Sequence, residues 1–96
     1  MRTSERRRKA FNFKVEAQRC IRQIRRELGL SQSGLAKKMV TDVDQSTISN
    51  WESGKNEIPL SKFIDILLLG GRNPLLYFDD FGKEEENKKD VKEVAK

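Results

Sequence analysis

The apolar residues of this chain recur at spacings of three and four positions, which is the period of helices that bury one face. One such set spans about residues 13–28 and consists of Phe13, Ala17, Cys20, Ile21, Ile24 and Leu28. A second set lies further along the chain and consists of Leu60, Phe63, Ile64, Leu67 and Leu68. No segment alternates with the period of a strand, so the sequence predicts an all-α fold, and 96 residues suffice for one small domain.

Capping residues mark two shorter helices between these sets. Gly29 supplies a left-handed cap for the first helix, and Ser31 is a favourable N-cap for a second helix that runs to about Met39. Residues 41–44 form the next connection. Asp44 then caps a third helix, which Gly54 closes.

The fourth helix begins near Pro59 or Ser61 and ends at the Gly70–Gly71 pair. Asn73 and Pro74 follow as N-cap and first residue of a short fifth helix, which we expect to end at residue 81.

Both ends of the chain differ from this helical domain, which we place at residues 12–81. Residues 1–11 are polar and strongly basic, and we interpret them as a flexible arm or a frayed extension of the first helix. Residues 82–96 form a charged tail without an apolar face, so disorder is the expected state and a partner-binding tail is the alternative.

The net charge of +5 is unevenly distributed. Residues 1–30 hold ten basic and three acidic residues, whereas the other 66 hold ten and twelve. An excess of +7 at the N-terminal end is expected if that end meets a polyanion, although a solubilising surface is the simpler interpretation.

The residue types present argue against several classes of protein. There is no His, which removes the commonest metal ligand and general base, and the single Cys20 lies on a core face. We find no catalytic constellation, and we expect no metal and no cofactor. No apolar run approaches the length of a membrane helix, so we expect a cytoplasmic protein, bacterial or phage-encoded and associated with the nucleoid.

The third helix carries an unusual density of small polar side chains. Ile48 and Trp51 mark its core side, and the opposite side lacks the Lys, Glu and Ala that usually fill exposed helix surface. Ser and Thr are poor helix formers, so their density suggests a purpose, although plain solvation is the alternative. Such side chains reach base edges in a DNA major groove, so we predict base-reading residues at Gln45, Ser46, Thr47, Ser49 and Asn50.

Backbone phosphates would be bound around this helix and at the N-terminal arm. The start of the second helix has free amides and a positive dipole end, and the loop after the third helix is basic. The predicted phosphate contacts are Gln32, Ser33, Ser53, Lys55, Asn56 and, in the arm, Arg6, Arg7, Arg8 and Lys9.

These residues resemble a known family. Ser31-Gln32-x-x-Leu35-Ala36, then Ile48-Ser49-x-Trp51-Glu52-x-Gly54, then Pro59, resemble the lambda-repressor-like (Xre) helix-turn-helix family over about residues 18–78. The resemblance implies a compact five-helix domain whose third helix enters the major groove. It also implies a repressor that binds a palindromic operator in double-stranded DNA as a homodimer.

The resemblance assigns roles to individual residues as well. It places Gln45, Ser46 and Asn50 at base-reading positions and Gln32 at a phosphate. It also implies an ion pair between Arg25 and Glu52, while a phosphate contact by Arg25 stays open. The chain departs from the family pattern in the connection around residues 40–42, which is two residues longer and lacks the usual Gly, and at Gly34, where a Glu would complete a capping box.

The last predicted helix is too rich in apolar residues for one face. We expect Leu75 and Phe78 to seal the core and the remainder, with Leu69, to form a dimer contact. The dimer interface is therefore placed at Leu75, Leu76, Tyr77 and Phe78.

Three alternatives to a repressor stay open. The chain would also suit the antitoxin of a toxin–antitoxin pair, whose tail binds a second protein. A controller protein of a mobile element or restriction–modification operon, or a pure protein-interaction module, is compatible too.

Overall fold

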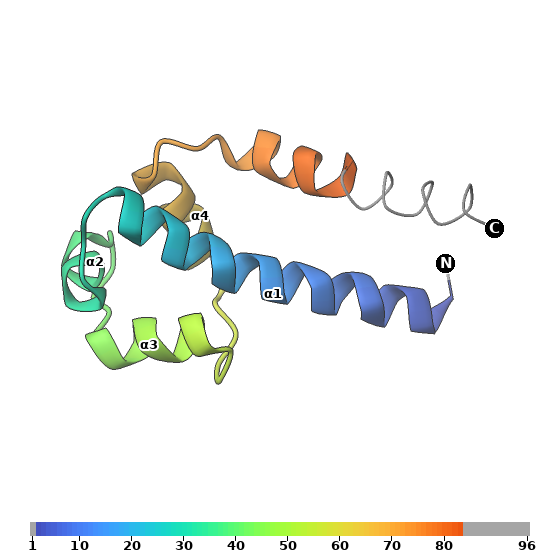
Figure 1. The fold of residues 1–96 in the computed structure, drawn as a ribbon, viewed down its shortest axis with the longest axis horizontal. Coiled ribbons are helices and arrows are strands. Elements are labelled where there is room, and N and C mark those ends of the chain that lie inside the picture. Colours follow the sequence, from blue (N-terminus) through green and yellow to red (C-terminus); the bar gives the residue numbers. More distant parts are fainter. Residues whose placement is uncertain (1, 84–96) are drawn as a thin grey trace.

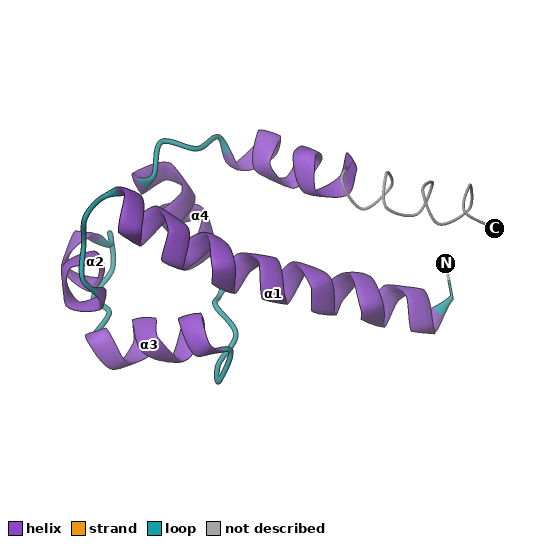
Figure 2. Cartoon of the chain, in the orientation of Figure 1, coloured by secondary structure: helices purple, strands orange, loops and turns teal. Residues whose placement is uncertain are grey.

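The computed structural model describes residues 2–83, and all of their regular structure is helical (Figures 1 and 2). The elements are α1 (Thr3–Glu27), α2 (Gln32–Lys38), α3 (Gln45–Ser53) and α4 (Leu60–Leu69), followed by a helical segment at residues 74–83. The predicted all-α, five-helix architecture is confirmed for this part of the chain. No helix among the described residues is long and apolar enough to cross a membrane.

The N-terminal basic segment is helical rather than a flexible arm. α1 begins at Thr3 and continues without interruption to Glu27, so the frayed-extension interpretation was nearer the structure. Its first half projects beyond the body of the domain in Figure 1. Phe13 anchors this half by stacking on Phe78 at 5.5 Å between ring centres and meeting Phe81 edge-on at 5.1 Å. Once a helix is nucleated, adding residues is inexpensive, and the Arg, Lys and Ala residues here are good helix formers.

A single core joins the helices. Ile21 and Ile24 of α1, Leu35 of α2 and Ile48 of α3 are fully buried, together with Ile66 and Leu67 of α4. Cys20 is a buried free thiol, as predicted, and burial raises its pKa. Two expectations about the core were wrong. Leu28, Leu60 and Leu68, which were assigned to buried faces, are exposed. Ile66, which was not in the predicted apolar face of α4, is fully buried.

The predicted caps are confirmed. Ser31 Oγ accepts the Gly34 N–H at 2.9 Å, and Asp44 Oδ1 accepts the Thr47 N–H at 2.8 Å. Gly54 adopts φ +81°, in the left-handed region that side-chain-bearing residues rarely adopt. Asn73 Oδ1 accepts the N–H of Leu75 at 3.0 Å and caps the last helical segment.

The helical segment 74–83 packs differently from the prediction. Tyr77 and Phe78 lie against the core, whereas Leu75 is 80% and Leu76 60% exposed, so it was wrong to assign Leu75 to the core. Helix also continues through residues 82 and 83, past the predicted start of the tail. The remainder of that predicted disordered tail, residues 84–96, lies outside the described residues.

Candidate nucleic-acid interface

α3 presents one apolar side to the core and one polar side to solvent. Ile48 and Trp51 are buried, as predicted, while Ser46 and Ser53 on the opposite side are exposed and Asn50 is half-buried. The helix therefore displays a row of amide and hydroxyl groups along an open face, in the orientation that groove reading requires.

An ion pair ties this helix to α1. Arg25 Nε donates to Glu52 Oε2 at 2.8 Å and Arg25 Nη2 donates to Glu52 Oε1 at 3.0 Å, which is a bidentate arrangement. Arg25 Nη1 also donates to the Leu30 carbonyl at 3.1 Å. Glu52 is only 5% exposed. The hydrogen bonds that Arg25 donates to this carboxylate raise the pKa of Arg25 above its usual value. The pair that the family resemblance implied is thus present, and it leaves Arg25 occupied inside the domain.

The same carboxylate begins a chain of side chains that reaches the front of α3. Gln32 Nε2 donates to Glu52 Oε1 at 3.4 Å, and Gln45 Nε2 donates to Gln32 Oε1 at 2.6 Å. The structure therefore brings together two residues predicted for different tasks, Gln32 for a phosphate and Gln45 for a base. Through this contact Gln45 is hydrogen-bonded to α2 at the exposed start of the helix.

Asp44 holds the first hydroxyls of α3. Its Oδ1 accepts hydrogen bonds from Ser46 Oγ at 2.9 Å and from Thr47 Oγ1 at 2.7 Å, besides the Thr47 amide. These bonds, those from Thr47 first, lower the pKa of the Asp44 carboxyl. Since the two hydroxyl protons are committed to Asp44, Ser46 and Thr47 face solvent as acceptors, suited to amino groups on bases. Asp44 was predicted from the sequence as a cap alone, without this second role.

Three of the predicted phosphate contacts, Ser53, Lys55 and Asn56, lie at or just after the C-terminal end of α3. Ser53 Oγ donates to the Asn50 carbonyl at 3.3 Å, and the Asn56 amide donates to the same carbonyl at 3.2 Å. Lys55 and Asn56 themselves are exposed on the loop after α3. Ser33 is exposed at the start of α2.

Two side chains of α4 form hydrogen bonds with the long connection before α3. α2 ends at Lys38, one residue before the expected end, so the connection comprises residues 39–44 and is longer than the predicted 41–44. Asp65 Oδ2 accepts the Val40 amide at 2.8 Å, and the Lys62 ammonium donates to the Thr41 hydroxyl. Neither α4 residue was predicted from the sequence to hold this connection. The one available signal was a charged Asp65 within the apolar run of α4.

The basic cluster of residues 6–9 lies on the projecting half of α1. Arg6, Arg7 and Arg8 are exposed and Lys9 is half-buried. Figure 1 shows this end of α1 well beyond the C-terminal end of α3, so the structure does not bring the cluster to the residues predicted to read bases. Because the cluster is part of a helix, its place relative to α3 is set by the fold.

The described residues contain no group of His, Cys, Asp or Glu side chains that could hold a metal ion. Hydrogen-bonding side chains on a protruding helix, with cations to one side, are suited to recognition of a polyanion. A family model described as helix-turn-helix matches residues 21–75, more than half of the chain. No curated protein and no solved structure matches the chain.

Proposed function

The chain belongs to the Xre/lambda-repressor-like helix-turn-helix family and is a DNA-binding transcription regulator; from this premise we propose that it is a repressor that binds a palindromic operator as a homodimer. In this proposal Gln45, Ser49 and Asn50 read bases as donors and acceptors, and Ser46 and Thr47 read them as acceptors. The phosphate backbone is met by Ser33 and Gln32 on one side of α3 and, on the other, by Ser53, Lys55 and Asn56.

The fixed orientation of α3 is the observation that carries this proposal. The buried Arg25–Glu52 pair and the Gln32–Gln45 contact place the start of the helix before any DNA arrives. A side chain held in its binding geometry loses less conformational entropy on binding, which favours specific contacts over adaptable ones.

The homodimer is proposed at the exposed part of the last helical segment. Tyr77 and Phe78 are engaged in their own core, which leaves Leu75 and Leu76 to contact a second copy. Sedimentation of a Leu75→Asp, Leu76→Asp double variant tests this surface, with Val40→Asp, which places one acidic residue at another exposed apolar position, as the control. We expect a monomer for the double variant and a dimer for the control; dimers of both would place the interface elsewhere.

Selection of bound duplexes from a random DNA pool tests the function itself. A two-fold symmetric site with half-sites about one helical turn apart, roughly 10 base pairs, is the expected result. A site without symmetry would contradict the homodimer, and failure to enrich any sequence would contradict sequence-specific binding.

A further inference from the structure

The last helical segment, residues 74–83, packs on the first half of α1 (Figure 1). Phe13 of α1 stacks on Phe78 at 5.5 Å between ring centres and meets Phe81 edge-on at 5.1 Å. Figure 1 shows that the two helices run in opposite directions, so the segment points along the projecting half of α1.

The two helices carry opposite charges near this contact. Residues 2–9 hold five basic residues and one acidic residue, whereas residues 79–86 hold five acidic residues and one basic residue. Lys9 and Arg6 precede Phe13 by four and seven positions, which places them on the face of α1 that meets the last helical segment. An acidic partner for this face would therefore have to come from the end of that segment.

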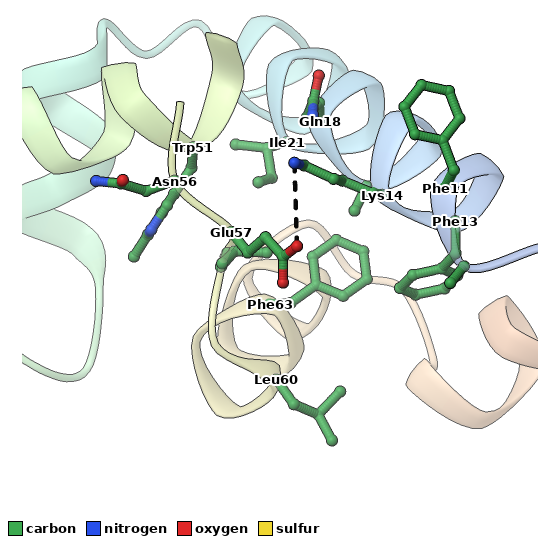
Figure 3. Close-up of a pocket in the computed structure, with 13 residues that line it drawn as sticks. Phe11, Phe13, Lys14, Gln18, Ile21, Trp51, Asn56, Glu57, Leu60 and Phe63 are labelled. Atoms are coloured by element: carbon green, nitrogen blue, oxygen red, sulfur yellow. Dashed lines mark ion pairs between the residues drawn. The ribbon is translucent and has the colours of Figure 1, made fainter. Parts of the chain in front are cut away.

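Cations of α1 that face other elements of the domain have carboxylate partners. Lys14 meets Glu57 of the loop after α3 at 3.9 Å (Figure 3), and Arg25 meets Glu52 of α3 at 2.8 Å. Neither Lys9 nor Arg6 forms an ion pair with another residue of the described chain. The face that they share is thus left without a counter-charge between residues 2 and 83.

We propose that the acidic run of residues 84–86, which lies outside the described residues, binds the face of α1 that carries Arg6 and Lys9. The helical spacing of the segment continues through the run in this proposal, so that Glu84 and Glu85 follow Phe81 by three and four positions on one face. Helices advance about 1.5 Å per residue, so in an antiparallel pair equal steps away from the aromatic contact stay opposite each other. The acidic run is then level with the basic cluster.

Bound in this way, the acidic run competes with DNA for two cations of α1. This consequence rests on the proposed DNA-binding function and on the predicted contact of residues 6–9 with phosphates. Exposed ion pairs are weak, so DNA displaces the run and is not blocked by it. Because phosphate contacts carry no sequence information, the run weakens binding to every duplex by a similar factor.

The contact itself is tested without DNA, by comparing backbone amide NMR spectra of the full chain and of the variant Glu84→Gln, Glu85→Gln, Glu86→Gln. Glutamine keeps a good helix propensity and removes the charges. We expect the amide signals of residues 6–9 to shift, although these residues are far from the substitutions in the sequence. Shifts confined to the sequence neighbours of the substitutions would overturn the proposal.

A charge-matched control replaces three acidic residues outside the run, as Asp42→Asn, Asp90→Asn and Glu93→Gln. It changes the net charge by the same amount and should leave the signals of residues 6–9 in place. Equal shifts in the control would reduce the effect to net charge and overturn the contact. If the shifts disappeared on dilution, the run would be bound to a second copy, which would overturn the contact within one chain.

Affinity for an unrelated duplex at low salt tests the competition separately. The variant of the acidic run should bind roughly twofold to thirtyfold more tightly than the wild type, as the loss of two exposed ion pairs provides. The slope of log affinity against log salt should steepen by about 2 as Arg6 and Lys9 reach phosphates. Both gains should vanish in an Arg6→Gln, Lys9→Gln background, and gains that persist there would overturn the competition. A wild type that bound no duplex would contradict the DNA-binding function, while the amide shifts would still decide the contact.

Discussion

Replacing Arg25 with methionine should cost the protein about 3 kcal/mol of its free energy of unfolding. Arg25 donates two hydrogen bonds to the Glu52 carboxylate, at 2.8 and 3.0 Å, and methionine would leave that buried charge with the Gln32 amide at 3.4 Å. Removing one partner of a buried ion pair costs about 3–5 kcal/mol. Because the Arg25 side chain is 17% exposed, we expect the lower end of this range.

Urea unfolding followed by Trp51 fluorescence measures the effect. With an m-value of about 1.5 kcal/mol per M for so small a domain, the midpoint should fall by roughly 2 M urea. Arg26→Met is the control, because Arg26 is adjacent, exposed and without an ion pair in the described part of the chain. A midpoint for Arg25→Met within about 0.3 M of the wild type would refute the view that this pair holds α3 in place.

Three further predictions concern pH and salt. Burial raises the pKa of Tyr77 above its usual 10.0, so folding favours the neutral phenol and the free energy of unfolding should fall as the pH rises above 10. In urea titrations from pH 8 to 11, Tyr77→Phe should reduce this alkaline loss. The variant should not be destabilised at pH 7, because the buried hydroxyl has no partner of ordinary hydrogen-bond geometry among the described residues. Hydrogen bonds from Thr47 lower the pKa of Asp44 below its usual 3.8, so the stability that Asp44 contributes is present above pH 3.8 and is lost as the pH falls below it. In melting curves from pH 7 to 2, Asp44→Ala should be less stable than the wild type at pH 7 and should lose less stability on acidification. Equal losses of stability in acid would contradict the cap. Replacing Arg6, Arg7 and Arg8 together with glutamine should weaken DNA binding and reduce the slope of log affinity against log salt by about 3 if all three meet phosphates, whereas an unchanged slope would exclude them from the interface.

Local signals in the sequence were sufficient to predict where α2 and α3 begin. Ser31 and Asp44 cap amides three residues along the chain, so the residues that decide the cap are all within one short window. The polar side of α3 was predictable for the same reason, because Ile48 and Trp51 define which side is buried.

Contacts between distant residues account for what the sequence analysis missed. Phe13 in the first half of α1 packs on Phe78, which is 65 positions further along the chain, and Asp65 accepts the amide of Val40, 25 positions before it. Four consecutive apolar residues at 75–78 cover every side of a helix, so periodicity could not tell which of them face the core. In the structure, Tyr77 and Phe78 are the two that pack against the core.

The central claim is that the polar face of α3 reads bases, and Asn50→Ala tests it most directly. Affinities of this variant and of the wild type should be compared on the selected operator and on an unrelated duplex of equal length at the same salt concentration. The account predicts a loss of about 1–3 kcal/mol, or roughly 5- to 150-fold, on the operator and almost none on the unrelated duplex. An equal loss on both duplexes, or no loss on either, would contradict it.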